Sequence, residues 1–303
     1  MNINEEPPVI HALNVCKSFG KHTVIEDVSL SVEAGIVYGL VGLNGAGKTT
    51  LLRLLLELLS PDKGSTEVLA GTMFRKREQM YQHCGVVLDH DGFWGNMTIM
   101  ENLKFYADAK GLSRESLTNY LEEDWAETGL LKINKKVKHL SRGQKMQCAL
   151  CRAFMGKPEA LFLDEPVIAL DLHAYRHFCT LIKKAKEKNA AVIISSHQLE
   201  LIDELCDRVA ILKDKKLEEV ECHRTPVWTI VTDKRDQWRH ILEQCGAANI
   251  QYFDGWNFAL ENREMIPEIV TRLSSAGCKM YGIFQAGNEF SSAIRSIFGP
   301  VES

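Results

Sequence analysis

The most chemically specific run in the sequence is rich in glycine and ends in a lysine and two threonines, Gly42-Leu43-Asn44-Gly45-Ala46-Gly47-Lys48-Thr49-Thr50. Glycines let backbone N–H groups wrap around phosphate oxygens, and a helix that begins directly after them adds partial positive charge. At this spacing Lys48 reaches the outer phosphates, and the Thr49 hydroxyl ligates Mg²⁺. The run therefore predicts a phosphate-binding loop for a nucleotide.

Acidic and imidazole side chains follow two other apolar runs. The run 160–163 leads into Asp164-Glu165, and the run 191–195 ends close to His197. Continuous apolar runs of this length are typical of buried parallel strands. Open α/β sheets bind ligands at the carboxyl ends of such strands, so these polar groups are expected to lie near the glycine loop.

The elements needed to position these residues can be traced along the chain. A strand over 36–41 runs through the glycine loop into a helix from Lys48 to Leu59, which is the context that a phosphate loop requires. The segment from about 89 to 157 is mostly helical, with amphipathic pieces at 101–106 and 122–131. Beyond Glu221 the pattern becomes strand, helix, strand, strand, helix, strand, which predicts a small α+β domain of the split βαβ type.

Composition narrows the class of protein. Hydrophobic residues make up 45% of the 303 residues and charged residues 25%, values typical of a globular protein. The formal net charge of -4 provides no broad basic field, so nucleic acid is not an expected partner. Nine cysteines without a compact spacing favour reduced thiols, and Cys148 and Cys151 fall inside an apolar helical run, where core packing is the simplest interpretation.

A phosphate loop alone leaves kinases, GTPases and many ATPases open, and four further segments narrow the choice. In chain order they are Leu140-Ser141-Arg142-Gly143-Gln144, Leu161-Phe162-Leu163-Asp164-Glu165-Pro166, Ala169-Leu170-Asp171 and Ser196-His197. In content and order the chain resembles the ATP-binding-cassette (ABC) ATPases from about residue 9 to residue 220. The resemblance implies a P-loop NTPase, RecA-like α/β core with an antiparallel β subdomain. Together with the strand and helix pattern beyond Glu221, it predicts a nucleotide-binding domain at 9–222 with a helical insert at about 90–157, and an accessory α+β domain at 223–303.

The resemblance also implies roles for individual residues. It makes Glu165, His197 and Lys48 the catalytic residues, with Glu165 polarising the attacking water and His197 contacting the γ-phosphate. Metal binding falls to Thr49, Asp164 and Asp89, where Asp89 stands at the position of the family's metal-sensing glutamine. ATP and Mg²⁺ are the expected cofactors. The glycine loop would bind the phosphates of ATP, and Phe19 would stack on adenine. The signature residues Ser141, Gly143 and Gln144 of a second subunit would contact the same nucleotide.

The expected function is that of an ATP-binding and ATP-hydrolysing subunit of an ABC transporter, which powers a separate transmembrane permease, with export favoured. The partners would be that permease and a second ATPase subunit, in a homodimer or a heterodimer. Phe93-Trp94 lies in the loop that faces the membrane partner in relatives, although both rings are equally compatible with a core position. The expected location is the inner face of the cell membrane, reached through the permease. A soluble ABC-type ATPase and a nucleotide sensor that does not turn over are the alternatives.

Overall fold

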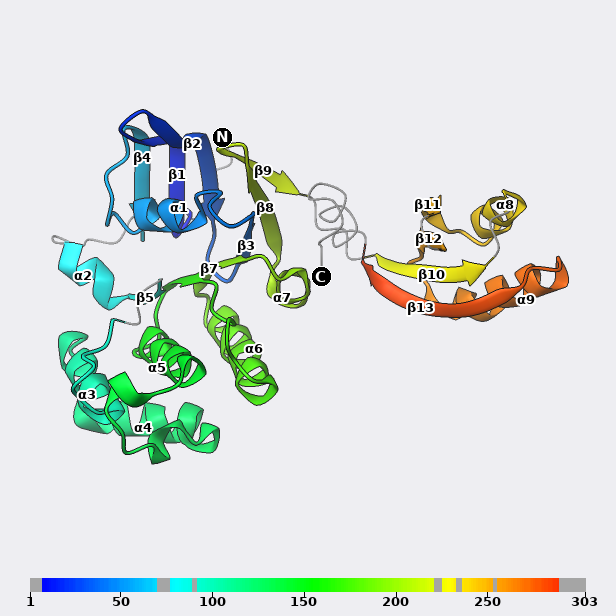
Figure 1. Ribbon diagram of the computed structural model, residues 1–303. Helices are drawn as coiled ribbons and strands as arrows, with labels where there is room; N and C mark the ends of the chain where they lie inside the picture. The colour runs from blue at the N-terminus through cyan, green and yellow to red at the C-terminus, as the bar shows by residue number, and fades with distance from the viewer. Residues whose placement is uncertain are drawn as a thin grey trace. The chain divides into compact units, whose positions relative to one another are not determined.

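The structure is a computed structural model that describes residues 7–69, 77–88, 92–220, 225–232, 236–252 and 255–288. The chain divides into two compact units, Met1–Val220 and Glu221–Ser303. The first unit holds every residue that the sequence analysis assigns to nucleotide chemistry. Figure 1 shows the elements of both units.

A mixed sheet forms the centre of the first unit. Its order is β5-β6-β7-β3-β8-β9, and within the described residues only the last pair, β8 with β9, is antiparallel. The strands are β3 (Val37–Val41), β5 (Cys84–Val87), β6 (Ala160–Asp164), β7 (Ala191–Ser196), β8 (Arg208–Lys213) and β9 (Lys216–Val220). Every position of β3, β6 and β7 is buried, which explains their continuous apolar sequences.

An antiparallel sheet in the order β2-β1-β4 lies beside this core (Figure 1). Its strands are β1 (Ile10–Phe19), β2 (His22–Val32) and β4 (Lys63–Val68). Helix α1 (Lys48–Leu55) packs against both sheets, and its residues Leu51, Leu52, Leu54 and Leu55 are fully buried. The helix predicted to reach Leu59 ends four residues earlier, because Leu56 leaves the helical conformation.

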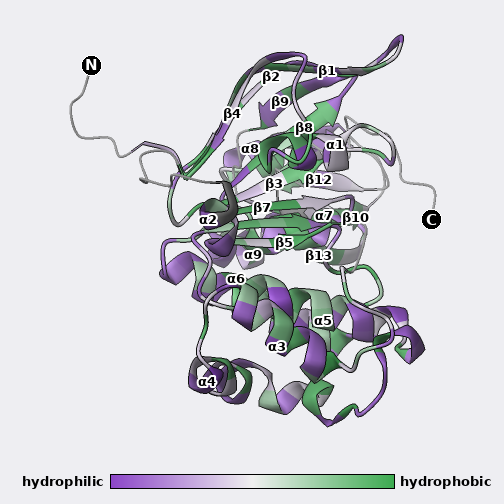
Figure 2. Cartoon of the chain, turned by 90° about the vertical axis from the view of Figure 1, so that its left-hand side faces the viewer, coloured by the Kyte–Doolittle hydropathy of each residue, from purple (hydrophilic) through white to green (hydrophobic). Residues whose placement is uncertain are grey.

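Helices fill the connection between β5 and β6. They are α3 (Ile99–Ala109), α4 (Arg114–Trp125) and α5 (Arg142–Phe154), with short 3₁₀ turns at Ala126–Thr128, Leu130–Lys132 and Val137–His139. Figure 2 shows hydrophilic and hydrophobic residues alternating along α3 and α5, as expected of helices that each bury one face. The remaining helices of this unit are α2 (Arg77–Gln82), α6 (Leu172–Glu187) and α7 (Leu199–Leu205).

The helix predicted over 122–131 is misplaced. Helix α4 begins earlier because the Ser113 hydroxyl accepts a hydrogen bond from the N–H of Ser116, which caps its N-terminus. It ends at Trp125, and Gly129 with φ 74° then breaks the chain into two 3₁₀ turns. The buried apolar residues of 122–131 thus belong to two separate elements, Trp125 to α4 and Leu130 to the second 3₁₀ turn.

The second unit has the predicted element order. It runs through β10 (Pro226–Thr232), α8 (Gln237–Gln244), β11 (Ala248–Tyr252), β12 (Trp256–Ala259), a 3₁₀ turn (Arg263–Met265), α9 (Ile266–Ser275) and β13 (Met280–Asn288). The strands form an antiparallel sheet in the order β11-β12-β10-β13. Trp238 and Leu242 of α8 and Ile269 and Leu273 of α9 are buried, with Phe258 of β12, in one apolar cluster. This α+β unit confirms the alternation of strands and helices read from the sequence.

The described residues bear on the state of the cysteines and on the presence of membrane-spanning helices. The eight cysteines among them carry no disulfide, and burial raises the pKa of the Cys151 thiol well above its ordinary value. None of the described helices combines the length and the apolar character that crossing a membrane requires. Cys148 and Cys151 lie in the core of α5, as the apolar helical run predicts.

Candidate functional site

The glycine loop connects β3 to α1 and takes a backbone course that other residues would resist. Gly45 and Gly47 have φ values of 82° and 110°, in the left-handed region. A Cβ atom on Gly42 would lie 2.8 Å from the carbonyl oxygen of Leu212, and one on Gly47 would lie 3.0 Å from Val24 Cγ1. The loop therefore needs these glycines for close backbone approach, and it leads directly into the N-terminus of α1, where an anion is favoured.

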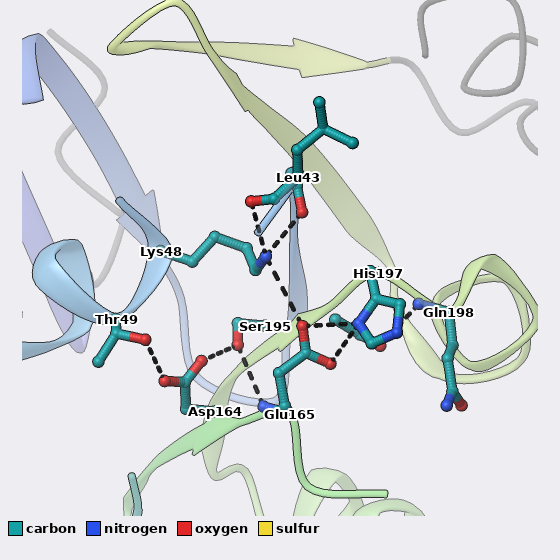
Figure 3. Close-up of polar contacts among 10 residues, drawn as sticks. Leu43, Lys48, Thr49, Asp164, Glu165, Ser195, His197 and Gln198 are labelled. Atoms are coloured by element: carbon teal, nitrogen blue, oxygen red, sulfur yellow. Dashed lines mark hydrogen bonds and ion pairs between the residues drawn. The ribbon is translucent and has the colours of Figure 1, made fainter. Parts of the chain in front are cut away.

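Lys48 extends its ammonium group back into this loop (Figure 3). The side chain is only 7% exposed, and Nζ donates to the carbonyl oxygens of Gly42 at 2.6 Å and Leu43 at 3.3 Å. It also lies 3.6 Å from the Glu165 carboxylate. A buried cation must be matched by acceptors, and phosphate oxygens entering the loop would replace carbonyl oxygens as the partners of Nζ.

Asp164 ends β6 and is 6% exposed, yet its carboxylate is fully engaged. Thr49 Oγ1 from the first turn of α1 donates to one carboxylate oxygen, and Ser195 Oγ from β7 donates to the other. Three elements therefore converge on one carboxylate, which fixes its position. Thr50 lies in the same first turn of α1 as Thr49.

Glu165 follows Asp164 and turns its side chain towards His197. Its backbone has φ 46°, a left-handed conformation that costs about 1 kcal/mol or more in a residue other than glycine. The backbone N–H of Glu165 donates to the carbonyl oxygen of Ser195 at 3.1 Å and to Ser195 Oγ at 3.2 Å, which holds this turn in place. His197 Nδ1 lies 2.9 Å from both carboxylate oxygens of Glu165, and with Glu165 ionised Nδ1 is the donor.

Ser195 belongs to this site although the sequence analysis assigned it only to a strand. Its side chain is fully buried, and it connects the carboxylate of Asp164 to the backbone of Glu165. The signal in the sequence was the pair Ser195-Ser196, which ends an otherwise apolar strand. Buried hydroxyls require hydrogen-bond partners, and a carboxylate on the neighbouring strand is a suitable one.

The predicted metal ligands are only partly described. The hydroxyl of Thr49 and the carboxylate of Asp164 meet in a direct hydrogen bond, so two oxygen ligands are already in place. Mg²⁺ is held in proteins by one or two such oxygens, with phosphates and water completing the octahedron, so this pair fits the ion. Asp89, the third predicted ligand, lies outside the described residues.

The signature residues form a separate group at the N-terminus of α5. The Ser141 hydroxyl accepts from the N–H of Gln144 at 3.2 Å, and the Gln144 side chain accepts from the N–H of Ser141 at 3.0 Å, which makes a capping box. In both views α1 lies on one side of the central sheet, and α5 and α6 lie on the other (Figures 1 and 2). Gly143 approaches the loop before α6 so closely that a Cβ atom would lie 2.4 Å from the carbonyl oxygen of Ala169.

Phe19, the predicted adenine contact, ends β1 with 51% of its surface exposed. Lys17 Nζ lies 5.8 Å from the centre of its ring and also pairs with Asp62 at 2.9 Å. Hydrogen bonds from Lys17 and from the N–H of Ser18 hold the pKa of the Asp62 carboxyl below its usual value. The ring is thus anchored beside a cation and keeps an accessible surface for stacking.

Comparison with known proteins identifies the family of this chain. Residues 25–168 match the family model described as ABC transporter. Over 213 residues the chain is 34% identical to the bacitracin transport ATP-binding protein BcrA of Bacillus licheniformis, an alignment that covers 70% of this chain and 69% of the relative. The chain belongs to the ABC transporter family. A second relative is the Nod factor export ATP-binding protein I of Burkholderia lata. It is 33% identical over 213 residues, an alignment that covers 69% of this chain and 70% of the relative.

A solved structure extends the comparison to the fold. A dimeric bacterial ABC transporter cassette superposes with a TM-score of 0.60 at 21% identity and covers 70% of this chain and 99% of its own. The P-loop NTPase fold predicted from the motifs is confirmed. As an ABC protein the chain binds and hydrolyses ATP.

Gly143→Ala tests the close approach of the signature turn to Ala169. The added methyl group cannot fit against the carbonyl oxygen at 2.4 Å, so the N-terminus of α5 must shift away. We expect the kcat for ATP hydrolysis to fall about tenfold and stability to fall by about 1–3 kcal/mol. Steady-state hydrolysis and thermal unfolding measure the two effects. Gly282→Ala is the matched control, since a Cβ atom there meets no atom within 4 Å; equal losses in both variants would contradict the prediction.

Proposed function

We propose that this ABC protein is the motor subunit of an export system and powers a separate transmembrane permease. The proposal rests on one cluster of contacts, which joins a phosphate-binding lysine, two oxygen ligands for a metal and a carboxylate paired with a histidine. Its members are Lys48, Thr49, Asp164, Glu165 and His197. The names of the relatives support transport: one is a bacitracin transport protein and another a Nod factor export protein. The working location would be the inner face of the cell membrane, beside the permease.

Nucleotide binding would rearrange contacts that the structure already shows. Lys48 exchanges the carbonyl oxygens of Gly42 and Leu43 for β- and γ-phosphate oxygens, while loop N–H groups take the remaining phosphate oxygens. Thr49 and Asp164 hold Mg²⁺, which neutralises charge on the phosphates. The ring of Phe19 would stack on adenine, while Lys17 keeps its ion pair with Asp62.

Hydrolysis would then depend on Glu165. Its carboxylate accepts a proton from water as the water oxygen attacks the γ-phosphorus, and the bond between that phosphorus and ADP breaks. His197 orients the carboxylate through its two contacts at 2.9 Å. Ser195 orients both acidic residues, since it contacts the carboxylate of Asp164 and the backbone of Glu165.

The working unit would be a pair of cassettes. The signature turn Ser141–Gln144 lies across the central sheet from α1, so a second subunit is the natural source of the turn that covers the nucleotide (Figure 1). The N-terminus of α5 and the Ser141 hydroxyl would add donors for the γ-phosphate there. One structural relative is a dimeric cassette, which supports this arrangement.

Contact with the permease is proposed for a group of aromatic residues, here called the aromatic patch. It consists of Phe93, Trp94, Phe105 and Tyr106. Trp94 is 45% exposed and Phe105 47%, and their ring centres lie 4.3 Å apart. Exposed aromatic residues in contact with one another are typical of protein interfaces, so the prediction that Phe93-Trp94 faces a partner is retained as a proposal.

The double variant Trp94→Ala, Phe105→Ala tests this contact. Purified from its own cells in mild detergent, the parent should carry a stoichiometric membrane protein, and the variant should lose it while its affinity for ATP changes by less than about twofold. Quantitative mass spectrometry of the purified material measures the partner. Tyr281→Ala, Phe284→Ala is the matched control, because these aromatic residues are even more exposed, at 73% and 52%, but belong to the second unit. Retention of the partner by the patch variant, or its loss from the control alone, would contradict the assignment.

The segment 223–303 is proposed as an accessory domain that adjusts assembly with these partners. Its own apolar cluster, built around Trp238, Phe258 and Ile269, gives it a core of its own. The nucleotide residues assigned from the motifs all precede it in the chain.

A further inference from the structure

Arg152 lies in the last turn of α5, eight residues beyond the signature residue Gln144. No motif assigned it a role. Its guanidinium contacts the strand that precedes Asp89 and also the aromatic patch. A planar guanidinium is suited to such a position because its N–H groups point in several fixed directions at once.

The first contact is with the central sheet. Arg152 Nη2 donates to the carbonyl oxygen of Val86 at 3.0 Å. Val86 lies in β5, the edge strand of the parallel part of the sheet, where it pairs with Phe162 of β6. Two residues beyond Phe162, the same strand β6 carries Asp164 of the nucleotide site.

The second contact is with the aromatic patch. The guanidinium carbon lies 5.2 Å from the ring centre of Phe93 and 5.1 Å from that of Tyr106. Arg152 Nη1 lies 3.5 Å from the Tyr106 hydroxyl, which in turn donates to the carbonyl oxygen of Gly92. Cation–π contacts of this kind favour one position of the rings over others.

Gly92 shows how closely these groups approach. Its φ is 63°, and a Cβ atom would lie 2.3 Å from Arg152 Nη1, so the backbone at this point is shaped around the guanidinium. Arg152 therefore touches the chain on both sides of the segment 89–91, at Val86 and at Gly92. The same residue is joined by one continuous helix to the signature turn.

We propose that Arg152 is a positioning residue for ATP hydrolysis, which couples the aromatic patch to β5 and, through α5, to the signature turn. A shift of the patch would move the guanidinium and with it the carbonyl oxygen of Val86, because the three are in direct contact. Nucleotide binding would be sensed at the patch by the reverse route, as coupling between sites is reciprocal. The inference rests on the proposed function in one respect, that the patch is the surface on which the permease acts.

The test uses the full chain alone and takes Trp94 as the reporter, since it lies 5.7 Å from Tyr106 within the patch. Its emission is obtained as the difference between the parent and Trp94→Phe. We expect ATP·Mg to change this emission in the parent, and Arg152→Met to abolish the change while the Kd for ATP stays within about twofold. The kcat of Arg152→Met should fall about tenfold, a loss confined to turnover. Arg114→Met, at an exposed position of α4, should behave as the parent in each measurement.

Tyr106→Phe provides a second variant that keeps the aromatic ring and removes only the hydroxyl between Arg152 and Gly92. If the two residues act as one unit, Arg152→Met should lower kcat by less than about twofold in the Tyr106→Phe background. Four results would overturn the proposal: independent, multiplicative losses in the double variant, a normal Trp94 response in Arg152→Met, no Trp94 response in the parent, or loss of ATP binding in Arg152→Met. Failure of the proposed function has a different signature, since Trp94→Ala, Phe105→Ala would then keep its membrane partner while the parent still showed the Trp94 response and Arg152→Met still lacked it.

Discussion

Glu165→Gln should lower the kcat for ATP hydrolysis by about 10²–10⁴-fold, the usual contribution of a general base. The amide keeps the size of the side chain and can still bond to His197, but it cannot accept the proton of the attacking water. The contacts of Asp164 with Thr49 and Ser195 do not involve Glu165, so ATP·Mg should still bind. Phosphate release under saturating ATP measures the loss.

The same substitution should change the state of assembly. When hydrolysis no longer reopens the pair, the ATP-bound dimer accumulates, because ligand held between two subunits stabilises their association. Light scattering on Glu165→Gln at saturating ATP·Mg should therefore report a dimer, and the nucleotide-free protein a smaller species. A strictly monomeric protein with nucleotide bound would contradict a homodimer and leave an unlike partner cassette as the second subunit.

Glu159→Gln is a demanding control for both measurements. Glu159 also pairs with a histidine, His83 Nδ1 at 2.7 Å, but the carboxylate is 52% exposed and belongs to the surface. It should keep parental turnover and should not accumulate as a dimer. A loss of turnover in Glu159→Gln equal to that in Glu165→Gln would show that disrupting any such pair is harmful, and would remove the assignment of Glu165 as the base.

Lys48→Ala should weaken ATP binding by at least about 100-fold, as expected when charge-assisted bonds to phosphate are lost. Its ammonium already occupies the glycine loop and bonds to the carbonyl oxygens of Gly42 and Leu43. Without it, the phosphates would meet those carbonyl oxygens and the Glu165 carboxylate with no cation between them. Isothermal titration calorimetry with ATP·Mg measures the change.

Lys183→Ala serves as the matched lysine variant. Its ammonium lies 3.9 Å from Glu204, and the side chain is 62% exposed, so an effect well below 1 kcal/mol is expected there. Unchanged ATP affinity in Lys48→Ala, with parental folding, would refute the assignment of the glycine loop. A result in which binding survives and only turnover is lost would restrict Lys48 to the chemical step.

Local patterns predicted much of the fold for identifiable reasons. The strands β3, β6 and β7 are buried on both faces, so their sequences are continuous apolar runs that stand out without any knowledge of their neighbours. The helices α8 and α9 each bury one face in the same apolar cluster, which makes their apolar residues recur at helical spacing. The prediction over 122–131 was wrong because its buried residues Trp125 and Leu130 belong to two separate elements, which together resemble a single amphipathic helix in the sequence.

The sequence by itself determined the class of chemistry, since the glycine loop with Lys48 and Thr49 has one established use and the later motifs follow in the order of one family. The residues of the glycine loop are neighbours in the chain, and Asp164, Glu165 and His197 follow the ends of buried strands. Their proximity is therefore expected from the motif itself and from the rule that parallel strands present their carboxyl ends at one edge of the sheet. Tertiary structure alone decided the roles of Ser195 and Arg152. Ser195 meets Asp164 through the pairing of β7 with β6, and Arg152 meets Val86, 66 residues away, through the packing of α5 on β5. A serine in a strand and an arginine in a helix are ordinary locally, and their significance arises only from the partners that long-range packing supplies.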